Sequence, residues 1–138
     1  MNDLKRFLEA QENDFEIALA EIRKGRKQSH WMWYIFPQIA GLGFSPTSKF
    51  YAIKDRGEAE NYLVHPLLGK RLIEISNALL EVEGKTANQI FGSPDDMKLK
   101  SSMTLFGALE NTNPVFQRVL DKYFEGMKDQ RTLELIEV

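Results

Sequence analysis

The sequence predicts an all-α, mainly helical fold. We expect one compact domain of about six to eight helices that comprises residues 1–138. Three observations support this prediction. Apolar residues recur at spacings of three and four along most of the chain, which is the period of an amphipathic helix. Segment boundaries carry capping residues, prolines and glycines that are typical of helix ends. The one β-like stretch, residues 49–54, is too short to build a sheet.

The residue pattern of the N-terminal half predicts a long helix followed by an irregular segment. An apolar face runs through residues 4–22 and stops at Gly25, a residue suited to the left-handed backbone that ends many helices. Residues 37–48 are rich in glycine and proline, and we expect them to be irregular. Asp55 then suits the N-cap of a short helix through residues 59–63.

The C-terminal half of the sequence contains several further capping residues and prolines that are typical of helix starts. Thr86 can cap a turn, while Ser93 before Pro94 and Asn113 before Pro114 each place a capping residue ahead of a proline in the first turn. His65, which precedes Pro66, is also expected to act as a cap. The predicted helices cover residues 68–82, 94–109, 114–124 and 129–136, and residues 87–91 are predicted to form a turn.

Composition narrows the possible functions. The chain has 138 residues, of which 43% are hydrophobic and 28% charged, as in ordinary globular proteins. Its net charge of −2 makes nucleic acid an improbable main partner, because nonspecific binding depends on neutralising phosphates. Cysteine is absent, which excludes disulfides, thiolate catalysis and cysteine-based metal centres.

We expect a soluble, cytoplasmic protein without a membrane partner. The first residues are charged and amphipathic, unlike a signal peptide, and no apolar run approaches the ~18 residues of a membrane span. The two histidines are not set in a known metal-ligand pattern, so neither a metal nor a cofactor is predicted. The sequence leaves the oligomeric state open.

Residues 29–38 form the most unusual segment, because they hold both tryptophans and one of the two histidines. Aromatic side chains this large either pack in the core or form a wall of a surface cleft. In the second case Trp31, Trp33 or Tyr34 would stack on a ligand, and Gln38 would help to orient it.

His30 also has two interpretations. It is either a structural residue that ties the turn, or a general base or anion contact at the mouth of a pocket. If the protein is an enzyme, which the sequence leaves uncertain, His30 is the candidate catalytic residue. A Ser29–His30 dyad is improbable, because neighbouring side chains usually point apart.

Two polar segments are candidates for anion binding. Arg26 and Lys27 follow a predicted helix end, where cations are commonly just solvated, but they could also attract an anionic ligand. Residues 98–104 are either a solvated helix face or a phosphate or carboxylate site, with Lys100, Ser101 and Ser102 as the contacting residues. A catalytic Ser–Lys pair in this segment is only weakly indicated, because the order is Lys-x-x-Ser.

Several short motifs occur in order along the chain, at residues 25–27, 29–33, 35–38, 41–45, 65–69, 90–92 and 98–106. With these motifs the sequence resembles one uncharacterised family of bacterial and fungal proteins, domain of unknown function 1810, of which some members are labelled calpastatin. The resemblance covers nearly the whole chain and implies a mainly helical fold, but no activity, cofactor or catalytic residue. The calpastatin label gains no support, because an inhibitor of that type is disordered and weakly apolar.

Two functions are therefore compatible with the sequence. One is a protein or enzyme that binds a small anionic, nucleotide-like metabolite between the His30 segment and the helix through residues 98–104. The other is a protein-interaction module that docks a partner through an exposed aromatic patch.

Overall fold

A computed structural model describes residues 4–137 and, over those residues, contains nine helices. The all-α prediction is confirmed, with slightly more helices than expected. The helices are α1 (Lys5–Arg23), α2 (Met32–Ile35), α3 (Pro46–Tyr51), α4 (Arg56–Val64), α5 (Leu68–Glu81), α6 (Ala87–Phe91), α7 (Asp95–Gly107), α8 (Val115–Phe124) and α9 (Gln130–Ile136). None of them combines the length and apolar character needed to cross a membrane.

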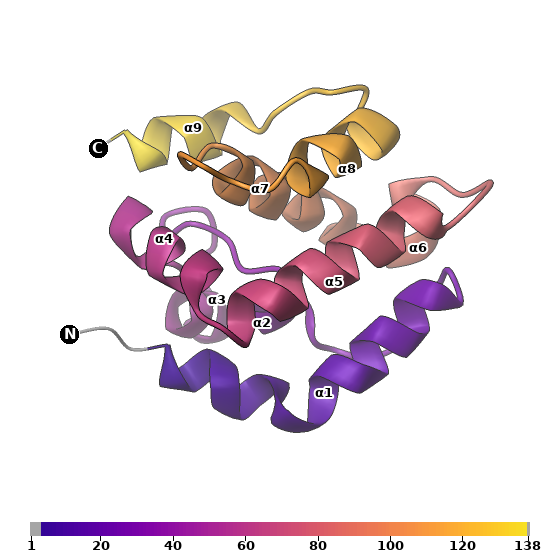
Figure 1. Cartoon of the computed structure of the whole chain (residues 1–138), viewed down its shortest axis with the longest axis horizontal. Helices are drawn as coiled ribbons and strands as arrows, with labels where there is room; N and C mark the ends of the chain where they lie inside the picture. The colour runs from indigo at the N-terminus through magenta and orange to yellow at the C-terminus, as the bar shows by residue number, and fades with distance from the viewer. Residues whose placement is uncertain (1–3, 138) are drawn as a thin grey trace.

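Helix α5 crosses the middle of the molecule (Figure 1). It packs against α1 on one side and against α8 on the other, and α7 joins α8 there. Helix α9 lies outermost against α7, while α4 and α6 lie at opposite ends of the view. The buried apolar side chains of these helices form one continuous core cluster.

Side-chain caps fix several helix ends as the sequence predicts. The Asp55 carboxylate accepts a hydrogen bond from the Glu58 amide, and Thr86 forms a capping box with Gln89. His65 Nδ1 accepts hydrogen bonds from the backbone amides of residues 67 and 68. Asn113 accepts one from the amide of residue 115, but the N-cap position of α8 is held by Pro114 and not by Asn113. The histidine at position 65 is therefore a cap.

Ser93 does not cap α7. That helix begins at Asp95 with Pro94 at its N-cap position, and no side chain caps it. The peptide bond between Ser93 and Pro94 is cis.

The stretch with β character, residues 49–54, is only half as expected: residues 49–51 are helical, and Ile53 forms a β-bridge. Helix α3 begins after Ser45, whose hydroxyl accepts a hydrogen bond from the Ser48 amide. Phe50 and Tyr51 favour β structure as residue types, but the cap and Pro46 at the first helical position override that preference. Among the described residues, β pairing is limited to one parallel bridge between Ile39 and Ile53.

Candidate functional site

Residues 28–31, which we call the tryptophan turn, are anchored to α1 by Glu21. The buried Glu21 carboxylate accepts hydrogen bonds from the Gln28 amide at 2.8 Å, the Ser29 amide at 3.0 Å and the Ser29 hydroxyl at 2.6 Å. The indole nitrogen of Trp31 donates a fourth, at 2.8 Å. Burial alone would raise the pKa of Glu21, but these donors lower it from 4.5 to about 2. Glu21 is therefore an anchor that stays ionised.

Trp31 belongs to the core. Its side chain is 1% exposed, and its ring packs near those of Phe36 and Phe91. The Lys27 ammonium nitrogen lies 5.1 Å from the ring centroid and covers it from the surface side of the turn. The prediction that Trp31 stacks on a ligand therefore finds no support, because no face of the indole reaches solvent.

Asp95 joins the basic turn to the start of α7. Its carboxylate lies 3.0 Å from Lys27 Nζ and 3.2 Å from Lys98 Nζ. The Lys98 ammonium in turn lies 5.0 Å from the centroid of the Trp33 ring. The basic residue Lys27, the aromatic residue Trp33 and the start of α7 therefore lie close together in space. Asp95 and Lys98 make the contacts that join them.

Beside this junction lies an open hollow of about 580 Å³, which we call the basic hollow. The polar residues that line it are Arg26, Lys27, Lys85, Asn88 and Gln89. They come from the turn after α1 and from the segment that contains α6.

Two of these cations have no carboxylate partner within residues 4–137. Arg26 is exposed and makes no salt bridge there, and Lys85 Nζ donates a hydrogen bond to the Gly25 carbonyl at 3.0 Å. Gly25 permits this approach, because its φ is +79° and a Cβ at that position would lie 2.9 Å from Lys85 Nζ. Lys27 is already paired with Asp95. The net positive charge of the basic hollow thus comes from Arg26 and Lys85.

The side-chain amides of Asn88 and Gln89 add hydrogen-bond donors to the basic hollow. The Oε1 atom of Gln89 accepts a hydrogen bond from the Thr86 amide, which leaves the Nε2 protons of Gln89 for other partners. Asn88 Nδ2 donates one hydrogen bond to Asp96 at 3.2 Å and has a second proton. The lining is thus rich in donors suited to phosphate or carboxylate oxygens.

Trp33 and Gln38 meet in a different and much smaller hollow. Its volume is about 10 Å³, enough for one water molecule, and Tyr51 and Ser48 also line it. A ring-containing ligand does not fit there. Tyr34 is half-buried, donates to the Asp14 carboxylate and packs against Tyr51; burial, with this hydrogen bond, raises its pKa.

The remaining predicted residues lie apart from both hollows. His30 is exposed, and its backbone carbonyl accepts a hydrogen bond from the Tyr34 hydroxyl at 3.3 Å. Lys100 is half-buried on α7. The structure therefore brings Arg26 and Lys27 together, but it does not add His30 or Lys100 to them.

Ser101 and Ser102 correct the prediction of a solvated or ligand-facing helix surface. They are 7% and 0% exposed, because α4, α6, α8 and α9 surround α7. The Ser101 hydroxyl lies 3.2 Å from both the Met97 carbonyl and Asp129, whereas the Ser102 hydroxyl has no hydrogen-bond partner within residues 4–137. Neither hydroxyl is available to a ligand in solution.

Sequence reasoning missed Lys85, Asn88 and Gln89. The sequence marks their segment only as a turn capped by Thr86, and nothing local shows that it folds against the turn after α1. The backbone contact that reveals it is the hydrogen bond from the Lys27 amide to the Ile90 carbonyl at 2.7 Å.

The fold and this geometry define an all-helical protein with a cation-lined hollow beside a buried tryptophan turn. The chain belongs to the family described as protein of unknown function, DUF1810, whose model matches residues 1–136. It is similar to the conserved hypothetical protein Rv1873 from Mycobacterium tuberculosis, a crystal structure with 47% sequence identity and a TM-score of 0.96. That match covers 99% of this chain and 97% of the other. The curated proteins contain no match to this chain.

Proposed function

We propose that the protein binds a small anionic metabolite, bearing phosphate or carboxylate groups, in the basic hollow. The observation that supports this proposal best is the convergence of Arg26, Lys27 and Lys85 on one hollow of about 580 Å³ in a chain of net charge −2. This cation cluster opposes the overall charge of the protein and would attract anions locally.

Arg26 and Lys85 have distinct parts in this proposal. The Arg26 guanidinium can hold two oxygens of one phosphate or carboxylate in its planar fork, whereas Lys85 supplies a compact charge. Lys27 keeps its pairing with Asp95 and adds less, because its charge is already compensated. The hollow is open, so the affinity should fall as salt screens these charges.

The proposal assigns binding and no reaction. His30 does not line the basic hollow. It could act as a proton carrier only for a ligand that extends beyond this hollow. A cytoplasmic location, expected from the sequence, stays part of the proposal.

Titration calorimetry with inorganic pyrophosphate, citrate and neutral adenosine tests this function. We expect at least one of the two anions to bind and adenosine not to bind. Arg26→Ala and Lys85→Ala should each weaken that binding by about tenfold. Lys70→Ala is the matched control, because Lys70 is exposed on α5 and does not line the hollow. Absence of anion binding, or equal weakening in all three variants, would contradict the proposal.

A second candidate function, docking of a second copy through an aromatic patch, is favoured by two exposed phenylalanines. Phe44 is 78% exposed and Phe50 is 58% exposed, so the exposed aromatic residues belong to the α3 region and not to the tryptophan turn. Size-exclusion chromatography with light scattering tests this candidate. A concentration-dependent dimer that Phe44→Ser abolishes would support it, and a strict monomer would eliminate it.

A further inference from the structure

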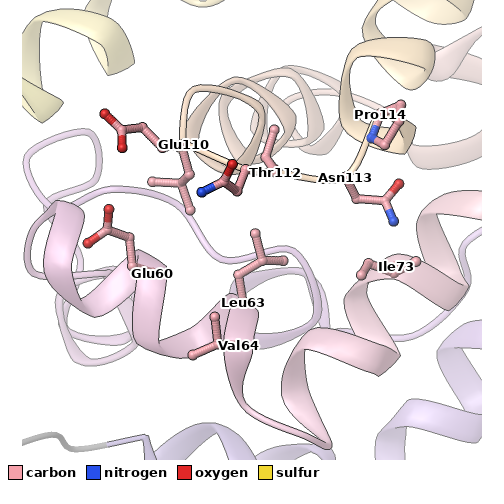
Figure 2. A pocket seen from close by; sticks show the side chains of 10 residues that line it. Glu60, Leu63, Val64, Ile73, Glu110, Thr112, Asn113 and Pro114 are labelled. Carbon is pink, nitrogen blue, oxygen red and sulfur yellow. The ribbon is translucent and has the colours of Figure 1, made fainter.

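A second hollow, of about 620 Å³, lies between α4, α5 and the loop that joins α7 to α8 (Figure 2). It shares no lining residue with the basic hollow. Its charge is also opposite, because Glu60 and Glu110 line it and none of its lining residues is cationic. We call it the acidic hollow.

One part of the acidic hollow is apolar. Leu63 and Val64 come from α4, Ile73 comes from α5, and Leu109 adds to this wall from the end of the α7 segment. Figure 2 shows the Leu63 side chain directed into the space below the loop. Val64 is 78% exposed, which is unusual for a β-branched apolar residue in a helix that packs on its neighbours.

The carboxylates lie at one end of this wall. Figure 2 shows Glu60 rising from α4 on the same side of the hollow as Glu110 in the loop. Both are exposed, and neither forms a salt bridge within residues 4–137. Arg56, one turn before Glu60, does not line the acidic hollow, and its guanidinium contacts the Ala108 carbonyl and Glu137.

A further oxygen acceptor lies in the same loop. The Thr112 hydroxyl donates its proton to the Phe106 carbonyl at 2.6 Å, so its own oxygen can act only as an acceptor toward a ligand. An alkylammonium head donates three hydrogen bonds and accepts none, which matches acceptors of this kind.

We propose that the acidic hollow binds a small organic cation with an apolar body, a primary alkylammonium compound. The ammonium group lies between Glu60 and Glu110, and the alkyl chain covers Leu63, Val64 and Ile73. Charge complementarity selects the head, and burial of apolar surface selects the chain. This site is independent of the anion site proposed above.

Hexylammonium tests both parts of this proposal when it is compared with methylammonium, 1-hexanol and hexanoate. Hexanol and hexanoate keep the alkyl chain but lose the positive charge, while methylammonium keeps the charge but loses the chain. Binding is followed from backbone amide shifts of the intact protein by NMR. We expect hexylammonium to bind about tenfold more tightly than each of the other three, with shifts centred on residues 60–64 and 109–113.

Glu60→Gln and Glu110→Gln should each weaken hexylammonium binding several-fold, and the double variant should weaken it by about tenfold or more. Glu83→Gln is the control, because Glu83 is exposed and does not line the acidic hollow. Both target glutamates are exposed, so these variants should fold. The proposal is overturned if hexanol binds as tightly as hexylammonium, if the double variant binds normally, or if no ligand shifts these residues. Arg26→Ala should leave hexylammonium binding unchanged, which separates this result from the proposed anion site.

Discussion

The indole nitrogen of Trp31 donates a hydrogen bond of 2.8 Å to a carboxylate oxygen of Glu21. This contact joins the tryptophan turn to α1 inside the protein, where both side chains are buried. It explains how a polar group and a tryptophan share the core, since each satisfies the other's hydrogen-bonding requirement. Lys27 lies over the Trp31 ring and also lines the basic hollow, so it links this buried contact to the hollow.

Glu21→Gln should destabilise the protein by about 2 kcal/mol at pH 7, because an amide replaces a carboxylate that accepts four hydrogen bonds. The folded-state pKa of about 2 lies below the usual 4.5, so ionised Glu21 stabilises the fold above pH 4.5. That contribution is lost as the pH falls from 4.5 toward 2. Urea denaturation across this range should therefore show a smaller loss of stability for the variant. Glu16→Gln, an exposed change on the same helix, serves as control; identical pH profiles for both variants would refute the role of Glu21.

Trp31→Phe should cost about 2–3 kcal/mol, because it removes a buried hydrogen bond and leaves a gap in the core. Trp33 is half-buried, so Trp33→Phe should cost about 1 kcal/mol. Thermal and urea denaturation measure both values. Trp33→Phe should not alter pyrophosphate binding, because Trp33 does not line the basic hollow. If this variant binds pyrophosphate more weakly, the ligand extends past Asp95 to Trp33.

Gly69→Ala should be strongly destabilising. A Cβ at position 69 would lie 1.9 Å from the Leu63 backbone carbonyl oxygen, so α4 and α5 would have to separate at their junction, at a cost of about 3 kcal/mol or more. Gly57→Ala is the matched control within α4, because a Cβ there meets only the Asp55 carboxylate at 3.4 Å. It should stabilise the protein by up to about 1 kcal/mol. Equal melting temperatures for the two variants would contradict this packing.

Ser102→Ala should leave stability unchanged or raise it, because the buried Ser102 hydroxyl has no hydrogen-bond partner in the structure. Ser101→Ala should lower stability by about 1 kcal/mol, since it removes a hydroxyl that lies 3.2 Å from Asp129. Urea denaturation compares the two. A large loss of stability in Ser102→Ala would show that this hydroxyl is hydrogen-bonded in solution.

The sequence predicts the long helices well, because their apolar stripes and caps are local signals. The stripe through residues 68–82 becomes α5 (Leu68–Glu81), and the signal around Asn113 becomes α8. Helix α7 is different, since it is buried on nearly all sides and its small polar residues are inside with the apolar ones. Periodicity then cannot show which face meets water.

The candidate site is only partly predictable. Arg26 and Lys27 adjoin in sequence and line the basic hollow together, so local reasoning finds them. Lys85 and Asn88 reach the same hollow only because the α6 segment folds back onto the turn after α1, and a single sequence carries no signal for that contact. The aromatic residues 29–38 stand out in the sequence and suggest a binding site. Trp31, however, is a buried core residue, so its presence there is explained by packing.

The most direct test of the anion site is an NMR titration of the intact, isotopically labelled protein with pyrophosphate. We expect saturable shifts of backbone amides in residues 25–27 and 84–92, while the indole proton of Trp31 stays bound to Glu21 and nearly unshifted. Shifts confined to other surfaces, or absence of any saturable shift at low salt, would contradict it.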